Sequence, residues 1–219
     1  MVPILALLYT PWASADLTLS QEIEGGPQTG EIVMRLKGDR LRLDLPAGPN
    51  GRMSTILDIV TGDTTTLRHD KKLAVTRTGA ELKEAARKAG ADSSRKIEPP
   101  KPANTGLKER VGEYEAEVFT MFADASKDTL WVVRDFPNFP EIKADLMRVS
   151  QATATGLNRA GTLDVSTLPG MVVKRQKERG GRKMTITLKS VGLEAIEDST
   201  FTIPPDYKPI APRTPASAN

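Results

Sequence analysis

The stretch that most constrains the fold is residues 112–149, because the spacing of its apolar side chains changes twice within it. In residues 114–122 one set of alternate positions is largely apolar, and the other set turns apolar toward the end. This pattern predicts a strand that begins with one solvated face and ends with two buried faces. After a turn, residues 130–133 are apolar without alternation, which predicts a second strand buried on both faces.

A helix is expected directly after this strand and is the nearest element that can cover its second face. Asn138 and Glu141 have the spacing of a capping box at a helix start. Four apolar residues then share one helical stripe: Phe139, Ile142, Leu146 and Val149. We therefore expect a twisted antiparallel sheet with this helix across one face. Between the two lies either packed core or a pocket.

The rest of the chain also has the alternation of a mainly β protein. Six strands joined by short turns are expected in residues 17–78, and a last hairpin in residues 171–191. The clearest hairpin is residues 30–45, GEIVMRLKGDRLRLDL, with one apolar and one strongly charged face. Residues 79–90 have the composition of a helix, and residues 201–205 are expected to form a short edge strand.

These elements are expected to form a single domain over residues 16–207. Of the 219 residues, 38% are apolar and 27% charged, which suits a globular unit with a full core. Residues 91–106 carry Pro, Ser and charge without periodicity, which predicts a mobile surface loop. Residues 208–219 contain three prolines and are predicted to be a disordered tail.

Residues 1–15 differ in kind from the rest of the chain. They carry no charged side chain, and Ala13-Ser14-Ala15 has the small-x-small pattern of a signal-peptide cleavage site. We interpret them as a secretory signal peptide; a buried N-terminal strand or helix is the alternative. The run is too short to span a bilayer, so no transmembrane segment is expected. The mature protein is therefore expected in the periplasm or outside the cell.

Composition excludes several classes of function. The chain has no cysteine, which rules out thiolate catalysis, iron–sulfur ligation and disulfides. It has 31 basic and 28 acidic residues, a net charge of only +3, so no nucleic-acid partner is expected. No phosphate loop, dinucleotide fingerprint or zinc-ligand spacing is present in the sequence. We therefore expect no cofactor, no metal and no enzymatic activity.

Two polar features of the sequence are candidates for a catalytic or metal-binding role. His69 is the single histidine and stands beside Asp70, with no nucleophile near it in sequence, so a surface turn residue is favoured over a catalytic one. Glu113, Glu115 and Glu117 share one strand face and can bind a cation or serve a hydrolase. A solvated face paired with Lys or Arg of the next strand is the favoured interpretation.

A basic run is expected at the tip of the last hairpin, where it can contact anionic lipid headgroups or an acidic partner. Its members are Lys174, Arg175, Lys177, Arg179, Arg182 and Lys183. The alternative is that these charges only keep the tip solvated. Peripheral membrane contact thus remains one hypothesis for this surface.

Several short motifs carry a resemblance to a known family. They are KGDRLRLDL, ILDIVTGDTTTLRHDKKLAVTRT, EVFTMF, LWVVRDFP, the LPG before Met171, and FTIPPDY. Together, over residues 17–207, they resemble an uncharacterised family of exported bacterial proteins that looks like a distant relative of the LolA/LolB lipoprotein carriers and the periplasmic sensor RseB. The resemblance implies a strongly curved, unclosed antiparallel β-barrel of about ten or eleven strands, with helices covering its concave face. It brings no catalytic residues, and in the carriers the cavity holds the acyl chains of a lipoprotein.

The leading hypothesis is a non-enzymatic carrier that binds a lipid, an acylated protein or another hydrophobic ligand between sheet and helices. The residues expected to line such a cavity are Trp131, Phe119, Met121, Phe136, Phe139, Leu146 and Met147. The rival hypothesis is a structural or sensory module of the cell envelope with a solid core, which binds another protein through its surface.

Overall fold

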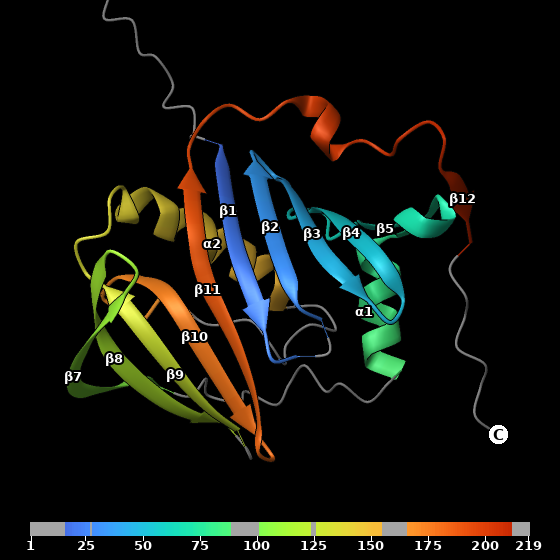
Figure 1. Ribbon diagram of the computed structural model, residues 1–219. Helices are drawn as coiled ribbons and strands as arrows, with labels where there is room; N and C mark the ends of the chain where they lie inside the picture. Colours follow the sequence, from blue (N-terminus) through green and yellow to red (C-terminus); the bar gives the residue numbers. More distant parts are fainter. Residues whose placement is uncertain (1–15, 27, 89–100, 124–125, 155–165, 212–219) are drawn as a thin grey trace, which may run out of the picture.

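The computed structural model describes residues 16–26, 28–88, 101–123, 126–154 and 166–211. Within these residues it contains twelve β-strands, two α-helices and two short 3-10 helices (Figure 1). None of the helices in this part of the chain is long and apolar enough to cross a membrane.

The first half of the sheet is the predicted meander of six strands. These strands are β1 (Leu17–Glu24), β2 (Gly30–Lys37), β3 (Arg40–Gly48), β4 (Gly51–Asp58), β5 (Thr64–Arg68) and β6 (Leu73–Arg77). The 3-10 helix η1 (His69–Lys71) connects β5 to β6, and α1 (Gly79–Lys88) follows β6 as predicted. Each strand pairs antiparallel with the next one along the chain.

The second half contains the stretch on which the sequence prediction was centred. Its strands are β7 (Ala103–Val111), β8 (Tyr114–Ala123), β9 (Ser126–Val133), β10 (Met171–Arg179), β11 (Arg182–Gly192) and β12 (Lys208–Ile210). Helix α2 (Phe139–Ala154) follows β9, and the 3-10 helix η2 (Asp198–Phe201) lies between β11 and β12. The predicted order of strand, turn, strand and helix is therefore confirmed.

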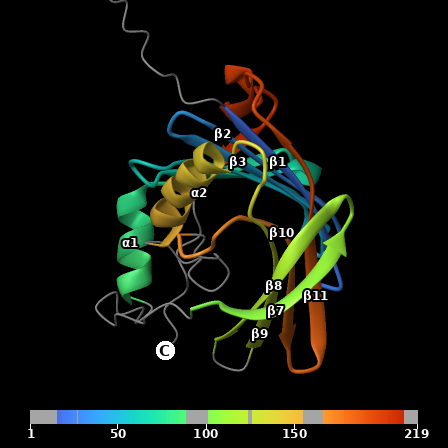
Figure 2. The same ribbon diagram turned by 90° about the vertical axis from the view of Figure 1, so that its left-hand side faces the viewer.

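All twelve strands belong to one sheet, in the order β12-β6-β5-β4-β3-β2-β1-β11-β10-β9-β8-β7. The two halves of the chain meet where β1 pairs with β11. The sheet bends around the side on which α1 and α2 lie, and its first and last strands do not meet (Figure 2). The predicted mainly β, curved and unclosed sheet is thus present, with twelve strands rather than ten or eleven and with only two α-helices in the described residues.

Helix α2 packs its predicted apolar stripe against one face of the sheet. Phe139 and Ile142 are buried in a large apolar cluster, and Leu146 and Val149 pack against it. From the sheet the same cluster includes Leu17, Leu19, Leu36, Leu41, Trp131 and Met171. The helix also reaches the β2–β3 turn, because Arg148 donates to the Gly38 carbonyl at 3.0 Å and to Asp39 Oδ1 at 2.6 Å.

Strand β9 is buried on both faces, as its unbroken apolar run predicted. Trp131 and Val133 belong to the large cluster that contains α2. Leu130 and Val132, which point the other way, form a smaller cluster with Phe119 and with Leu168 from the segment before β10. Helix α2 therefore covers one face of this strand, and the segment that contains Leu168 covers the other.

Three boundaries predicted from sequence are wrong. The surface loop expected over residues 91–106 ends before Ala103, where β7 begins and pairs with β8. The tail expected over residues 208–219 begins with a strand, because β12 pairs in parallel with β6. The edge strand expected over residues 201–205 is replaced by the end of η2 and irregular chain. In the first two cases pairing with a distant strand, rather than local pattern, decides the outcome.

The start of α2 also differs in detail from the prediction. The Asn138 carbonyl accepts the first helical hydrogen bond, from Ile142 N at 3.1 Å, so the boundary is where the sequence placed it. The φ of Asn138 is 54°, however, which is the left-handed region and not the extended conformation of a capping-box residue. The signal peptide predicted for residues 1–15 lies outside the described residues.

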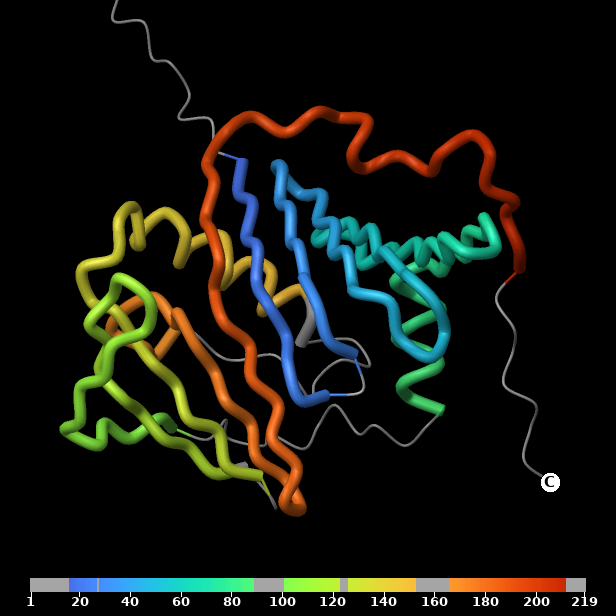
Figure 3. The backbone as a smooth tube through the Cα atoms, viewed as in Figure 1, coloured from blue at the N-terminus to red at the C-terminus, as the bar shows by residue number. Residues whose placement is uncertain are grey.

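A C-terminal segment (residues 193–211) crosses from β11 to the opposite edge of the sheet (Figure 3). The Ile196 carbonyl accepts from Lys37 Nζ at 2.5 Å, and the Ile196 amide donates to Asp16 Oδ2 at 2.7 Å. Farther along, the Arg40 guanidinium pairs with Asp198 at 2.6 Å and lies 5.2 Å from the centre of the Phe201 ring. This segment therefore fixes the outer strands of the first half.

We predict that Ile142→Ala lowers the free energy of unfolding by about 2–5 kcal/mol, because it opens a cavity between helix and sheet. Ile142 is only 1% exposed and joins α2 to the large cluster. Urea denaturation measures the loss. The control Ala144→Ser, at an exposed position of the same helix, is expected to cost less than about 0.5 kcal/mol. Equal losses in the two variants would refute this role for the helix.

Candidate functional site

The seven residues expected to line a cavity do not share one environment. Four of them belong to or pack against the large apolar cluster: Trp131, Phe136, Phe139 and Leu146. Phe119 is buried in the smaller cluster, on the other face of its strand. Met121 is buried and Met147 half-buried, and both lie outside the two clusters. The structure therefore brings together four of the seven and separates three from them.

Trp131 lies in packed core. It is 6% exposed, and its indole Nε1–H donates to Glu109 at 2.8 Å. The Lys174 ammonium lies 4.6 Å from the centre of its ring, within the range of a cation–π contact. With its edge hydrogen-bonded and its face covered, this side chain is already fully engaged. Any apolar ligand is better sought elsewhere on the sheet.

A second apolar surface continues from the core along β2, β3 and β4. Strand alternation places Ile32, Leu43, Leu45 and Met53 on the same face as the buried Leu36 and Leu41. Leu45 lies directly opposite Met53, and Leu43 lies opposite Met34 at the margin of the cluster. All four are half-buried and belong to neither described cluster. We call Ile32, Leu43, Leu45 and Met53 the lower apolar patch.

The lower apolar patch lies beyond the reach of α2. Helix α2 contacts the β2–β3 turn, whereas the patch lies toward the opposite ends of these strands. Sequence alternation had marked these residues as a dry face but gave no sign that the helix would cover only part of it. The sequence did contain one signal for this. The alternate apolar positions along β2 and β3 extend over a greater length than the width of one helix.

A pocket with a polar lining lies in the described part of the chain. It has a volume of about 260 Å³ and lies at the β7–β8 hairpin. Its lining residues are Lys108, Glu109, Arg110, Glu113 and Glu115. A wall of paired opposite charges does not suit an acyl chain, because burying charge against hydrocarbon is costly.

The predicted glutamate row is a paired, solvated face. Lys108 Nζ contacts Glu115 Oε1 at 2.8 Å, and Arg134 contacts both carboxylate oxygens of Glu117, at 2.6 and 2.8 Å. The hydrogen bond and charge of Lys108 lower the pKa of Glu115, and those of Arg134 lower the pKa of Glu117. No group of residues in the described part of the chain could hold a metal ion. The interpretation as paired surface charge is confirmed for these two glutamates.

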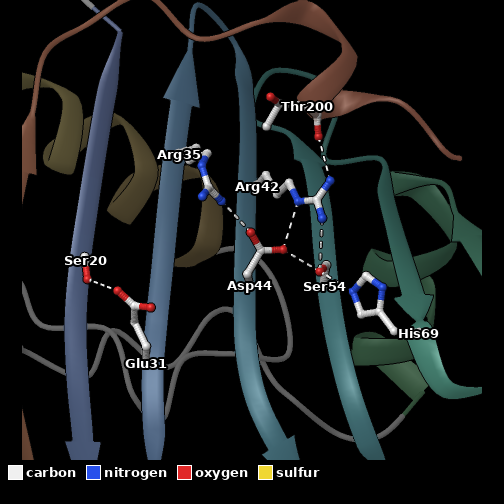
Figure 4. Close-up of polar contacts among 8 residues, drawn as sticks. All are labelled: Ser20, Glu31, Arg35, Arg42, Asp44, Ser54, His69 and Thr200. Atoms are coloured by element: carbon white, nitrogen blue, oxygen red, sulfur yellow. Dashed lines mark hydrogen bonds and ion pairs between the residues drawn. The ribbon is translucent and has the colours of Figure 1, made fainter.

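A polar network lies on the opposite face of β3 and β4 (Figure 4). Ser54, 1% exposed, donates from Oγ to the Asp44 carboxylate, and its Oγ lies 2.6 Å from His69 Nε2. His69 Nδ1 lies 2.6 Å from the Tyr207 hydroxyl. Arg42 donates to Asp44 at 2.9 Å and to the Thr200 carbonyl at 2.8 Å.

The charges around Asp44 keep it ionised. Burial raises the pKa of Asp44, but the hydrogen bond from Ser54 and the guanidinium groups of Arg42 and Arg35 outweigh it, so the pKa lies below its usual value. Arg35 contacts Asp44 at 2.5 Å. On the same face, Ser20 donates to the Glu31 carboxylate at 2.5 Å (Figure 4). The side chains of the charged face predicted for this hairpin are therefore joined to one another by hydrogen bonds and ion pairs.

His69 lies in the turn between β5 and β6, as predicted, but it is not a fully exposed surface residue. His69 is half-buried, and folding brings Ser54 against it from 15 residues away. The arrangement is nevertheless not that of a hydrolase, because the carboxylate accepts from Ser54 instead of orienting the imidazole, and Ser54 has no access to solvent. The network braces β3, β4 and η1 against the C-terminal segment.

The predicted basic run is split by the structure. Arg175 Nε pairs with Asp128, which is 2% exposed, at 2.9 Å, and Lys174 covers Trp131. Arg179, Arg182 and Lys183 remain exposed at the end of the β10–β11 hairpin. Lys177 is half-buried and does not belong to this exposed group. Only the end of the run is available as a basic surface.

Comparison with known proteins gives a family and two weak structural likenesses. A family model described as a domain of unknown function (DUF4412) matches residues 16–207. No curated protein matches the sequence. The structure of PNGF-II in its C2 space group is 8% identical with a TM-score of 0.42, and the match covers 90% of this chain and 31% of that chain. The chain thus spans about a third of the length of PNGF-II.

The second likeness is to LprF from Mycobacterium bovis. It is 13% identical with a TM-score of 0.36, and the match covers 89% of this chain and 90% of that chain. At these identities and scores neither likeness carries an argument about function.

We predict that His69 makes stability depend on pH. Burial and the nearby charges of Arg52 and Arg42 lower its pKa, against smaller opposing effects of Asp44 and Asp70. Protonation therefore favours the unfolded chain. The free energy of unfolding should fall as pH drops below about 6.5, the pKa of an unperturbed histidine, toward the lowered value in the fold.

The test compares wild type with His69→Gln by urea denaturation between about pH 7 and pH 5. The variant should be less stable at neutral pH, because one of its two ring contacts is lost, but its stability should change less over this range. Asp44 does not interfere, because its lowered pKa places its titration below this window. Parallel pH profiles of the two proteins would contradict the prediction.

Proposed function

From the premise that this chain belongs to the DUF4412 family of domains of unknown function, we propose that it is a non-enzymatic binding protein for a hydrophobic ligand. The ligand class is the acyl chain of a lipid or of an acylated protein. The lower apolar patch is the proposed contact surface. The resemblance of the sequence to the LolA/LolB carriers points to the same class of ligand.

The observation that supports this proposal is the half-burial of four adjacent apolar side chains on the inner face of a curved sheet. Ile32, Leu43, Leu45 and Met53 continue the core rows but are not sealed by α2. Each methylene group that moves from water onto such a surface contributes about 0.8 kcal/mol to the free energy of binding. An acyl chain is long and narrow enough to lie along neighbouring strands and complete this burial.

The polar clusters of the described residues support a role without covalent chemistry. Ser54 is buried and held by Asp44, and the glutamates of β8 are paired with Lys108 and Arg134. We place the protein in the periplasm or outside the cell, on the composition of residues 1–15. The partner from which it takes its ligand is proposed to be a membrane or an acylated protein.

A second candidate function is a module of the cell envelope that binds another protein through its surface. The packed environment of Trp131 favours this alternative, because it removes one of the places where a ligand was expected. The two candidates differ in whether an apolar small molecule binds the inner face of the sheet.

We predict that Met53→Gln weakens binding of a fluorescent fatty-acid probe by roughly tenfold, because a buried amide without a hydrogen-bond partner costs about 1–3 kcal/mol. The matched control is Ile56→Gln in the same strand. Ile56 is also half-buried but lies on the opposite face, opposite Arg42 and Thr65. Fluorescence titration measures both dissociation constants.

Mass spectrometry of organic extracts from natively purified protein tests for a bound ligand directly. A co-purifying lipid that the probe displaces supports the carrier. If nothing co-purifies and the probe does not bind, or if the Met53 and Ile56 variants lose binding equally, the carrier is rejected and the protein-binding module is retained.

A further inference from the structure

Two hairpin ends lie side by side at one end of the sheet, remote from the β2–β3 turn that α2 contacts. The end of β8, the start of β9 and the β10–β11 turn all lie at this end (Figures 1 and 2). Their adjacency is fixed by strand pairing, because Ser126 at the start of β9 lies opposite Arg179 at the end of β10. The exposed side chains on both faces of these four strand ends therefore make up the surface of one projecting end, with Phe122, Lys127 and Lys183 on one face and Arg179 and Arg182 on the other.

This surface has an exposed aromatic residue at one side. Phe122 is 68% exposed, although β8 otherwise buries its large apolar side chains, Val118, Phe119 and Met121. Exposing a phenylalanine on a strand that buries its neighbours is costly in water. Across the sheet Phe122 lies directly opposite the exposed Lys127.

Cations fill the rest of the surface. In the row of Phe122, Lys127 is followed across the strands by Glu178 and then by the exposed Lys183, which lies 3.9 Å from Glu178. In the next row Arg179 and Arg182 are paired directly opposite each other and both are exposed.

Two like charges in directly opposed positions destabilise a strand pair unless an anion lies between them. No described residue forms an ion pair with Lys127, Arg179 or Arg182. The described residues of the surface are four cations and Glu178, a net charge of +3. The surface thus combines an exposed aromatic side chain with an excess of cations, of which Lys183 has Glu178 as a described partner.

We propose that this surface, made of Phe122, Lys127, Arg179, Arg182 and Lys183, docks the protein on an anionic lipid bilayer. An aromatic ring is favoured at the interfacial level of a membrane, and nearby Lys and Arg are attracted to anionic headgroups. A projecting end of two hairpins can present these groups together to a flat surface. Binding to an acidic protein would explain the exposed cations but not the exposed ring of Phe122.

The docking surface and the lower apolar patch lie at the same end of the strands. Ile23 in β1 lies opposite Ile186 in β11, and from there β11 extends four more residues to Arg182 at the hairpin end. Docking would therefore bring the open end of the sheet toward the bilayer. The docking proposal does not rest on ligand binding, because its surface shares no residue with the patch.

The first test is flotation of the full chain with vesicles of phosphatidylcholine alone and of phosphatidylcholine with about 30% phosphatidylglycerol. We expect binding only to the anionic vesicles, weakened by added salt. Arg179→Ser/Arg182→Ser/Lys183→Ser should lower the partition coefficient about a hundredfold, at roughly fivefold per cation. The matched control Lys71→Ser/Lys83→Ser/Lys208→Ser removes the same charge from exposed positions elsewhere and should retain binding.

The second test isolates the ring. Phe122→Ala should lower the partition coefficient about fivefold at fixed charge, whereas Val60→Ala, at a 73% exposed position in the β4–β5 turn, should leave it unchanged. Circular dichroism of each variant confirms folding. The proposal is overturned if wild type does not float with anionic vesicles, or if the two triple variants lose binding to the same extent. Loss of fatty-acid probe binding by Met53→Gln is a separate outcome and leaves this result untouched.

Discussion

The packing of α2 against the sheet is the interaction on which the rest of the structure depends. The helix covers the upper rows of strands β1 to β3 and joins them to β9 and β10 through one apolar cluster. A sheet of twelve strands can bury its inner face around so few helices only by bending toward them. Because α2 is 16 residues long, it cannot also cover the far ends of the strands, and the lower apolar patch is the consequence.

On the outer face of the first six strands, polar side chains rather than apolar ones make the contacts between strands. Ser54 is buried and Asp44 half-buried there, and their partners come from β2, β3, β4 and η1. The C-terminal segment completes the network through Thr200 and Tyr207 and pairs β12 with β6. These contacts join the C-terminal segment to β3 and η1 on the outer face of the sheet.

The two proposals concern one end of the molecule. The lower apolar patch and the hairpin ends that carry Phe122 and the exposed cations lie toward the same end of the sheet. A protein that exchanges acyl chains with a membrane needs an apolar surface close to the bilayer and a charged surface that holds it there. The basic run contributes only its end to this arrangement, since Lys174 and Arg175 are engaged with Trp131 and Asp128.

The sequence alone determined most of the strands, the α2 stripe and the two-sided burial of β9, because alternation and helical period record which local face is apolar. Tertiary structure decided which residues far apart in the sequence pair or come into contact. It paired Ala103–Val111 and Lys208–Ile210 as strands, brought Ser54 to His69, and separated Phe119 from Trp131. It also decided which part of the apolar face α2 covers. These outcomes depend on pairing and coverage between segments far apart in the chain, which no local pattern encodes.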